Sequence, residues 1–157
     1  MSRPSVVVFD LGKVLVDFDY GIAIRRFAER SEAGMEQIKR LVDSPIQVEF
    51  ESGKITTNEF FAALRDGAGF RGDRAEFVSI FADIFWPMET MIAFFERLKL
   101  LGIPTCVFSN TNEIAIRHIR ERFPFYSRFD QYILSFEVGA MKPDEPIYDM
   151  VEQRTGE

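Results

Sequence analysis

The chain has 157 residues, enough to bury the core of one domain together with a small inserted one. Hydrophobic residues make up 46% and charged residues 28%, an ordinary composition for a globular protein. The net charge of −6 argues against a nucleic-acid partner, because a phosphate backbone requires clustered Lys and Arg side chains. A phosphorylated small molecule remains allowed, since it needs only a local positive charge.

The cysteine content and the N-terminus bear on the compartment. Cys106 is the only cysteine, so no disulfide can form within the chain, which suits a reducing cytoplasm. The apolar run at 6–9 ends at Asp10 and is too short for a signal peptide or a membrane span. We therefore expect a cytoplasmic protein without a membrane partner. The sequence leaves its oligomeric state open.

The first predicted element is a strand at 6–9, an unbroken run of β-branched and aromatic side chains. Such a run is typical of a strand buried on both faces of a parallel sheet. It ends at Asp10, which places a carboxylate at the strand's carboxyl end. This is the edge at which open α/β sheets bind ligands.

Between about residues 18 and 86 the apolar residues recur with helical spacing, and no strand is expected. Helices are predicted around 22–28, 35–42, 56–64 and 77–84. Thr56 and Glu59 fit a capping box that opens the third of these helices. Three glycines mark a connection between helices: Gly67, Gly69 and Gly72. We interpret residues 18–86 as a helical bundle inserted after the first strand.

An alternating strand and helix pattern then resumes. We expect a helix at 91–98 that ends near Gly102, a strand at 104–108, a helix through 114–119, a strand at 132–134 and a helix within 143–151. Strands that alternate with helices predict an α/β fold, a parallel sheet with helices on both faces. Residues 1–17 and 87–157 are predicted to form this core, and residues 18–86 the inserted cap.

Polar residues follow each predicted strand, and parallel strands bring them to one edge of the sheet. Asp10 follows the first, Ser109 opens the cluster at 109–112 after the second, and Lys142 lies beyond the third. A carboxylate can attack phosphorus and form an acyl-phosphate. A hydroxyl and backbone N–H groups can hold phosphate oxygens, and an ammonium can offset their charge. These groups together predict phosphoryl transfer to Asp10.

Three motifs carry a resemblance to a known family. Residues 9–17, with Phe9-Asp10-Leu11-Gly12-Lys13-Val14 at their start, resemble the first motif of the haloacid dehalogenase superfamily. They are most similar to its Phe-Asp-Leu-Gly-x-Val branch, which includes sugar-phosphate phosphatases. Residues 107–112 resemble the second motif and residues 139–144 the third. The order of the motifs and the helical insert also match, so the resemblance covers essentially the whole chain.

The resemblance implies a Rossmann-like core, Mg²⁺ as cofactor and hydrolysis of a small phosphate ester through an aspartyl-phosphate at Asp10. It implies that Asp10 and the backbone carbonyl of Gly12 bind the metal. The phosphoryl group and substrate are expected at five residues, namely Leu11, Gly12, Ser109, Asn110 and Lys142. The substrate is expected to be a small metabolite, with a sugar phosphate as one candidate.

Two departures from the family pattern stand out. Most family phosphatases carry a second aspartate two residues after the nucleophile as general acid, whereas this chain has Gly12. The contribution of such an acid, about 10²–10⁴-fold, must come from elsewhere or be absent. The family's fourth motif, an acidic pair expected roughly 20–25 residues past the lysine from ordinary element lengths, is also missing.

The chain ends at Glu157, before that fourth motif and the last core strand or strands of the family fold. The remaining acidic metal ligand is therefore absent from this chain. We expect weak Mg²⁺ binding and impaired activity, because one carboxylate and one carbonyl hold a hard ion poorly. Two explanations stay open, a fragment of a longer chain or a degenerate family member.

Two rival functions also stay open. A metal-independent 2-haloacid dehalogenase would use the same aspartate, but 11–13 (Leu-Gly-Lys) do not match the dehalogenase motif. A non-catalytic family member could serve as a binding module, which Gly12 supports.

Several further residues receive weaker interpretations: capping for Asn112, structural roles for Asp17 and Asp19, a surface role for His118, burial for Cys106, either charge near the phosphate or a solvated side chain for Lys13, and substrate contact as a lesser alternative for Glu49, Glu51 and Lys54.

Overall fold

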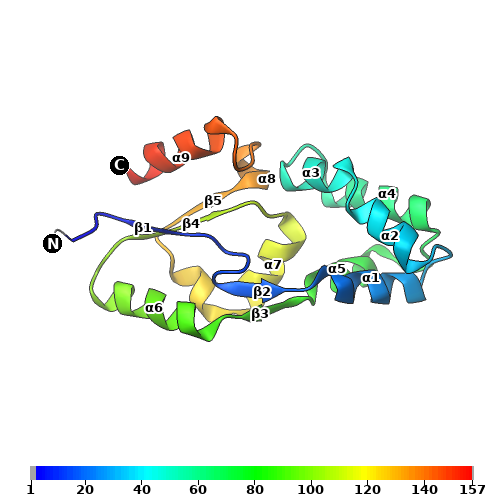
Figure 1. Ribbon diagram of the computed structural model, residues 1–157, viewed down its shortest axis with the longest axis horizontal. Coiled ribbons are helices and arrows are strands. Elements are labelled where there is room, and N and C mark those ends of the chain that lie inside the picture. Colours follow the sequence, from blue (N-terminus) through cyan, green and yellow to red (C-terminus); the bar gives the residue numbers. More distant parts are fainter. Residues whose placement is uncertain (1–2, 157) are drawn as a thin grey trace.

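A parallel sheet lies at the centre of the protein, whose computed structural model describes residues 3–156. Its strands run in the order β1 (Val7–Phe9), β4 (Thr105–Ser109) and β5 (Gln131–Leu134). Phe9 lies opposite Val107, and Ser109 lies opposite Leu134. All three carboxyl ends therefore point to the same edge of the sheet, as Figure 1 shows.

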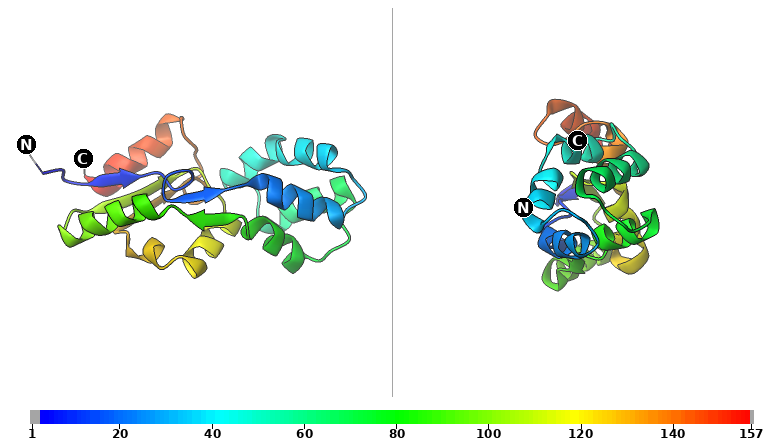
Figure 2. Two further views of the ribbon diagram at one scale, coloured as in Figure 1. Left: turned by 60° about the horizontal axis from the view of Figure 1, so that its bottom comes forward. Right: turned by 90° about the vertical axis from the view of Figure 1, so that its right-hand side faces the viewer.

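Helices cover both faces of this sheet. Figure 2 shows α6 (Glu89–Leu100), α7 (Glu113–Arg122) and the short η1 (Pro124–Arg128) on one side and α9 (Glu145–Thr155) on the other. Side chains alternate along β4, so Val107 packs toward α6 and α7 while its neighbour Cys106 packs with Ile147 of α9. The predicted α/β fold, with helices on both faces, is confirmed.

A second lobe consists of helices that pack on one another beyond the sheet edge. They are α1 (Tyr20–Glu29), α2 (Met35–Val42), α3 (Pro45–Glu51), α4 (Thr57–Ala68) and α5 (Arg74–Ala82). Phenylalanines fill the core of this lobe, for example Phe60, whose ring stacks on that of Phe50 at 4.3 Å between centroids. Each buried Phe stabilises the fold by roughly 1.5–3 kcal/mol. Thr56 forms the predicted capping box with Glu59.

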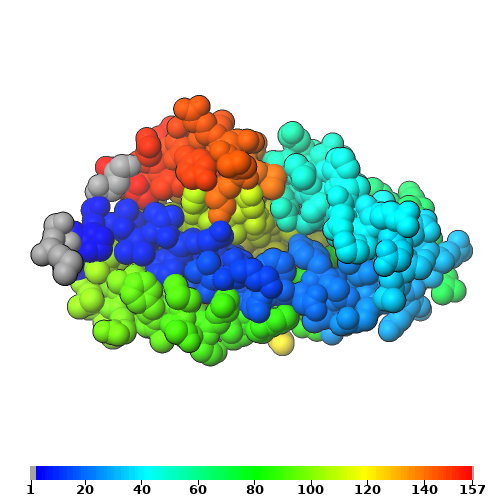
Figure 3. Space-filling model, in the orientation of Figure 1, coloured from blue at the N-terminus to red at the C-terminus, as the bar shows by residue number. Residues whose placement is uncertain are grey.

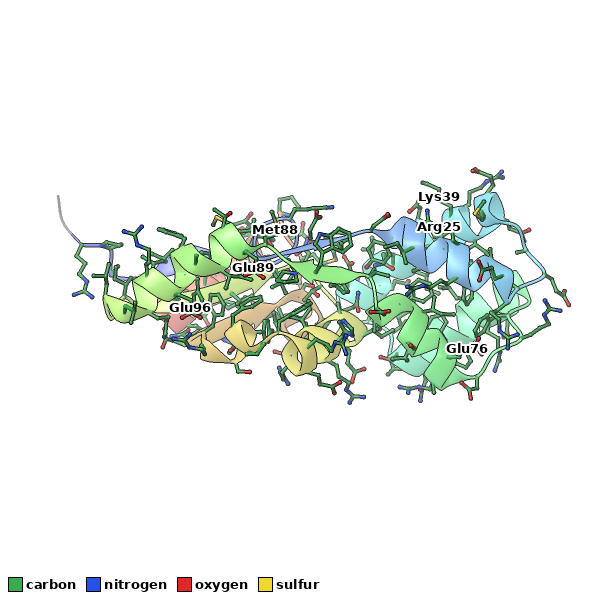
Figure 4. The ribbon with its side chains drawn as sticks, turned by 90° about the horizontal axis from the view of Figure 1, so that it is seen from below. Arg25, Lys39, Glu76, Met88, Glu89 and Glu96 are labelled. Carbon is green, nitrogen blue, oxygen red and sulfur yellow. The ribbon has the colours of Figure 1, made fainter. Side chains whose placement is uncertain are left out.

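Many charged side chains lie on the outside of the two lobes. Figure 4 shows Arg25, Lys39 and Glu76 around the helical lobe and Glu89 and Glu96 along α6. The space-filling view shows the segment after β5 (orange) beside the helical lobe (cyan), so the lobes are in contact there (Figure 3). No helix among residues 3–156 is both long enough and apolar enough to span a bilayer.

Two short strands join the lobes, and these correct one expectation. β2 (Val16–Phe18) and β3 (Phe85–Pro87) pair antiparallel, with Asp17 opposite Trp86. The expectation of no strand between residues 18 and 86 was therefore wrong at Phe18, Phe85 and Trp86. Three-residue strands are too short to show a period, and their pairing depends on residues far apart in sequence. The assignment of 18–86 as a separate cap domain stays a prediction.

Other differences concern element ends and short helices. The helix α3, the helix α8 (Ser135–Val138) and η1 were not predicted, since each spans fewer than eight residues. Gly67 lies within α4, and Gly69 ends that helix with a left-handed φ of 63°. Gly102, with φ of 62°, follows the C-cap of α6, Leu101, close to the predicted end.

Candidate active site

Asp10 lies directly after β1 at the ligand-binding edge of the sheet. Its Oδ1 accepts a hydrogen bond from the Leu11 backbone N–H at 2.7 Å. Its Oδ2 lies 2.8 Å from the Nζ of Lys142, and 45% of its side chain is exposed. The carboxylate is thus oriented by one backbone donor and one ammonium while still facing solvent.

Lys142 reaches Asp10 from the loop between α8 and α9. Its Nζ also donates to the carbonyl oxygen of Phe108 at 3.1 Å and lies 4.8 Å from the centroid of the Phe108 ring. An ammonium has three N–H donors, and two of them are used by Asp10 and Phe108. The third can bind an oxygen of a phosphoryl group beside Asp10.

Asn110 holds the backbone of Lys142 with both ends of its side-chain amide. Its Nδ2 donates to the Lys142 carbonyl oxygen at 3.0 Å, and its Oδ1 accepts from the Lys142 N–H at 2.8 Å. One N–H of Nδ2 remains, so phosphate binding by Asn110 stays a prediction. In this structure Asn110 positions the lysine, a role that the motif alone does not indicate.

Ser109 is the last residue of β4 and is buried. Its hydroxyl donates to the Asn110 carbonyl oxygen at 3.2 Å, a weak contact that a phosphate oxygen can replace. The next turn is held by the first residue of α8, because the Thr111 N–H donates to the Ser135 hydroxyl at 2.9 Å. Asn112 accepts from the Ala115 N–H at 3.0 Å, which confirms its predicted role as helix cap.

A cavity of about 60 Å³ lies between the sheet edge and the helical lobe, next to Leu11 and Gly12. Gly12, Ser109 and Asn110 line its floor, and the aromatic rings of Phe18 and Phe85 form part of its wall. This volume is below the roughly 300–1,000 Å³ of pockets that enclose small molecules, so the cavity would hold only part of a substrate. The other lining residues are Leu11, Val16, Tyr20, Glu51, Thr111, Asn112, Ala115 and Ile119.

Two lining residues from the helical lobe, Glu51 and Tyr20, were not among the predicted site residues. Burial raises the pKa of the Tyr20 hydroxyl to about 12, and the nearby Glu51 adds to this. Burial also raises the pKa of Glu51 above its usual range. The sequence offered Glu49, Glu51 and Lys54 equally as possible substrate contacts. Of these three, Glu51 is partly buried, whereas Glu49 and Lys54 are exposed.

Lys13 and two nearby aspartates organise the entry to the helical lobe. Lys13, with a left-handed φ of 62°, forms an ion pair with Asp17, and its Nζ donates to the Phe18 carbonyl oxygen at 2.9 Å. Asp19 caps α1 by accepting from the Gly21 N–H at 2.7 Å. These contacts agree with structural roles for Asp17 and Asp19.

His118 and Cys106 lie away from this site. His118 packs between the rings of Phe85 and Phe123, and burial lowers its pKa. Cys106 is buried within β4, where burial raises its pKa to about 11. A thiol held protonated in this way is a poor nucleophile.

The oxygen donors at the end of β1 match the preference of Mg²⁺ for hard ligands, although they are few. The Asp10 carboxylate and the Gly12 carbonyl are the donors that the motif implies. Across residues 3–156 there is no cluster of three or more His, Cys, Asp or Glu side chains able to hold a metal ion. Residues 3–156 therefore supply two expected donors, and the other ligands of an ion at Asp10 would come from elsewhere.

The parallel sheet has its polar site residues at the carboxyl ends of its strands. This arrangement defines the class of the protein, that of α/β enzymes whose chemistry takes place at that edge of the sheet. A family model described as haloacid dehalogenase-like hydrolase matches residues 4–157. The chain belongs to this family and is a hydrolase, as the three motifs indicate.

Similar proteins include phosphatases. The chain is 23% identical to the pyrimidine 5′-nucleotidase YjjG of Escherichia coli, over 96% of this chain and 71% of the relative. It is 25% identical to the D-ribitol-5-phosphate phosphatase of Bacteroides thetaiotaomicron, over 92% of this chain and 74% of that protein. The comparison with the structure of an HAD family enzyme from Bacteroides thetaiotaomicron, in complex with magnesium and inorganic phosphate, gives a TM-score of 0.84 at 23% identity. It covers 97% of this chain and 79% of that one and supports the fold.

Proposed function

We propose that this protein is a phosphatase that hydrolyses a small phosphorylated metabolite through an aspartyl-phosphate at Asp10. The observation that carries the proposal is the 2.8 Å contact between Asp10 Oδ2 and the Lys142 ammonium at the edge where the strands end. A carboxylate oriented beside a cation, next to a cavity, suits attack on an anionic phosphorus centre.

In the first step a carboxylate oxygen of Asp10 attacks phosphorus, and the bond from phosphorus to the leaving oxygen breaks. Lys142 binds a phosphoryl oxygen with its remaining N–H, while Ser109 and the backbone N–H groups of Leu11 and Gly12 bind the others. In the second step water attacks the phosphorus of the acyl-phosphate. Inorganic phosphate leaves, and Asp10 is restored.

Asp10 and the Gly12 carbonyl would hold Mg²⁺, which offsets the negative charge of the carboxylate and the phosphate when it is bound. Asn110 acts indirectly, because its two amide contacts fix the backbone of Lys142. The helical lobe selects the substrate, because Tyr20 and Glu51 reach the cavity from its side. A small sugar phosphate fits a wall that combines aromatic and polar groups.

The central test measures phosphate release from a panel of phosphorylated metabolites by the parent protein and by Asp10→Asn. We expect a loss of about 10³-fold or more in the variant, because the amide is a much weaker nucleophile. Mass spectrometry of the parent after rapid acid quench should find one phosphoryl group on Asp10. Equal activity of parent and variant would rule out the proposed nucleophile.

A non-catalytic binding module is the second candidate, favoured by Gly12 and by the small number of carboxylates at the site. Beryllofluoride with Mg²⁺ separates the two functions, since it forms a stable adduct only with an aspartate poised for phosphorylation. A phosphatase should capture it at Asp10, and Asp10→Asn should not. Capture by neither protein would favour the binding module.

A further inference from the structure

The leaving oxygen needs a proton when the phosphorus–oxygen bond breaks, yet the position that supplies it in most relatives cannot do so here. Gly12 has no side chain, and the space for one is filled. A Cβ at Gly12 would lie 2.9 Å from Cε1 of the Phe18 ring, closer than a carbon atom can approach. A proton donor must therefore enter the cavity from another element.

Glu51 is held over the cavity from the end of α3. Its carbonyl oxygen lies 2.5 Å from the Ser135 hydroxyl, which also contacts the turn after β4 through Thr111. Two residues further on, Gly53 has φ of 70°, and a Cβ there would lie 2.1 Å from the Phe136 carbonyl oxygen. The chain around Glu51 thus rests directly on the backbone of α8, as the neighbouring positions of α3 and α8 in Figure 1 illustrate.

The surroundings of the Glu51 carboxyl favour its neutral form. Glu51 is the last residue of α3, where the free carbonyl groups of the helix repel a negative charge. Its Oε1 accepts a hydrogen bond from Gln47 Nε2 at 2.8 Å, which by itself favours the carboxylate, but burial has the larger effect and raises the pKa of Glu51. Among residues 3–156 no Lys or Arg forms an ion pair with Glu51.

The second carboxyl oxygen, Oε2, forms no hydrogen bond with residues 3–156, so it is available to a substrate in the cavity. Burial raises the pKa of Glu51, which favours the protonated carboxyl that a general acid requires. Of the groups lining the cavity, Asn112 and the backbone amides hold no proton that they can transfer near neutral pH, and Tyr20 gives up its proton only in strong base.

We propose that Glu51 is the general acid of the reaction and replaces the side chain that Gly12 lacks. This inference rests on the proposed phosphatase function. When the phosphorus–oxygen bond breaks, its electron pair goes to the leaving oxygen, which takes the proton from Glu51 Oε2. Glu51, now a carboxylate, accepts a proton from the water that attacks the aspartyl-phosphate, and its acid form is restored.

The test compares two phosphate donors in the parent protein and in Glu51→Gln with Mg²⁺ present. Acetyl phosphate has a leaving group that needs no proton, whereas glycerol phosphate releases an alkoxide that does. We expect Glu51→Gln to lose about 10²–10⁴-fold on glycerol phosphate and much less on acetyl phosphate. The variant retains an oxygen that accepts from Gln47, and the backbone contact to Ser135 is unchanged, so it should fold as the parent does.

Glu29→Gln is the matched control, because Glu29 is the last residue of α1 and its side chain is exposed. It should hydrolyse both donors as the parent does. An equal loss on both donors in Glu51→Gln would overturn the inference in favour of a structural role. A parent that cleaves acetyl phosphate but no alkyl phosphate would overturn it too, while leaving the proposed function intact.

A second readout does not depend on turnover. Carbon-13 NMR of labelled glutamate carboxyls, assigned with Glu51→Gln, reports the ionisation of Glu51 directly. Titration of Glu51 above the range of the other glutamates is expected, and titration within that range would overturn the inference. If the parent phosphorylates Asp10 from neither donor, the proposed function fails and the inference falls with it.

Discussion

The ammonium of Lys142 lies 2.8 Å from the carboxylate of Asp10, although 132 positions separate the two residues in the chain. The parallel sheet accounts for this proximity, since it brings the ends of β1 and β5 to one edge, from which the loop before α9 returns to β1. The pair links the nucleophile to the group that binds phosphate, and both are oriented before a substrate enters.

Replacing Lys142 by methionine should remove the cation while keeping the length of the side chain. We expect turnover to fall by about 10²–10³-fold, the usual cost of losing one donor to a charged transition state. Vanadate should also bind more weakly. Lys39→Met is a suitable control, because Lys39 lies on the helical lobe and pairs only with the exposed Asp43. Unchanged vanadate affinity in Lys142→Met would contradict the phosphate-binding role.

Asn110→Ala should reduce activity, because it removes the side chain that holds the backbone of Lys142. The Lys142 backbone loses both amide partners, so the free energy of unfolding should fall by about 1–3 kcal/mol. Turnover should fall as the ammonium becomes less well placed. Urea denaturation and steady-state kinetics measure the two effects. Asn58→Ala, which removes a single exposed contact with Arg74, should change stability by less than about 0.5 kcal/mol.

Gly53→Ala should separate the end of α3 from α8. The added methyl group meets the Phe136 carbonyl oxygen, and a φ of 70° disfavours any residue with a Cβ. We expect a lower melting temperature and a loss of turnover on alkyl phosphates, because Glu51 moves with this segment. Gly34→Ala is the control, since its Cβ would meet nothing within 4 Å and its φ is −77°. Equal melting temperatures for both variants would show that the contact is not close in solution.

The raised pKa of Glu51 predicts how stability varies with pH. Between the pKa of Glu51 in the unfolded chain and its higher value in the folded protein, the folded state binds more protons. Folding stability from this group therefore decreases as pH rises through that interval. Glu51→Gln should consequently be more stable than the parent near neutral pH and lose this advantage in acid. Thermal denaturation of the parent and of Glu51→Gln between about pH 4 and about pH 8 measures how their difference in stability depends on pH. A difference that stays constant over this range would contradict the prediction.

Mg²⁺ and phosphate should bind cooperatively. Because the described residues offer one carboxylate and one carbonyl near Asp10, phosphate oxygens are needed to complete the coordination of the ion. Each ligand alone should raise the melting temperature slightly, and both together should raise it by more than the sum. Asp10→Asn should abolish the excess. A full shift with Mg²⁺ alone would indicate a metal site that is complete without phosphate.

The sequence by itself determined the class of fold and the main polar groups of the site. Asp10 and Ser109 each follow an apolar run, and this local pattern is enough to place them at strand ends. Capping by Thr56 and Asn112 could also be predicted, because a cap depends on residues only three positions apart.

Only the tertiary structure decided which distant side chains contact the residues of the site. The motif of Asn110 predicts phosphate binding, but it does not predict that the amide also holds the backbone of Lys142, 32 positions away. Glu51 enters the cavity because the end of α3 rests on Ser135, 84 positions away. Local sequence patterns report the preferences of neighbouring residues. A contact between distant segments depends on how whole helices pack, and no short pattern contains that information.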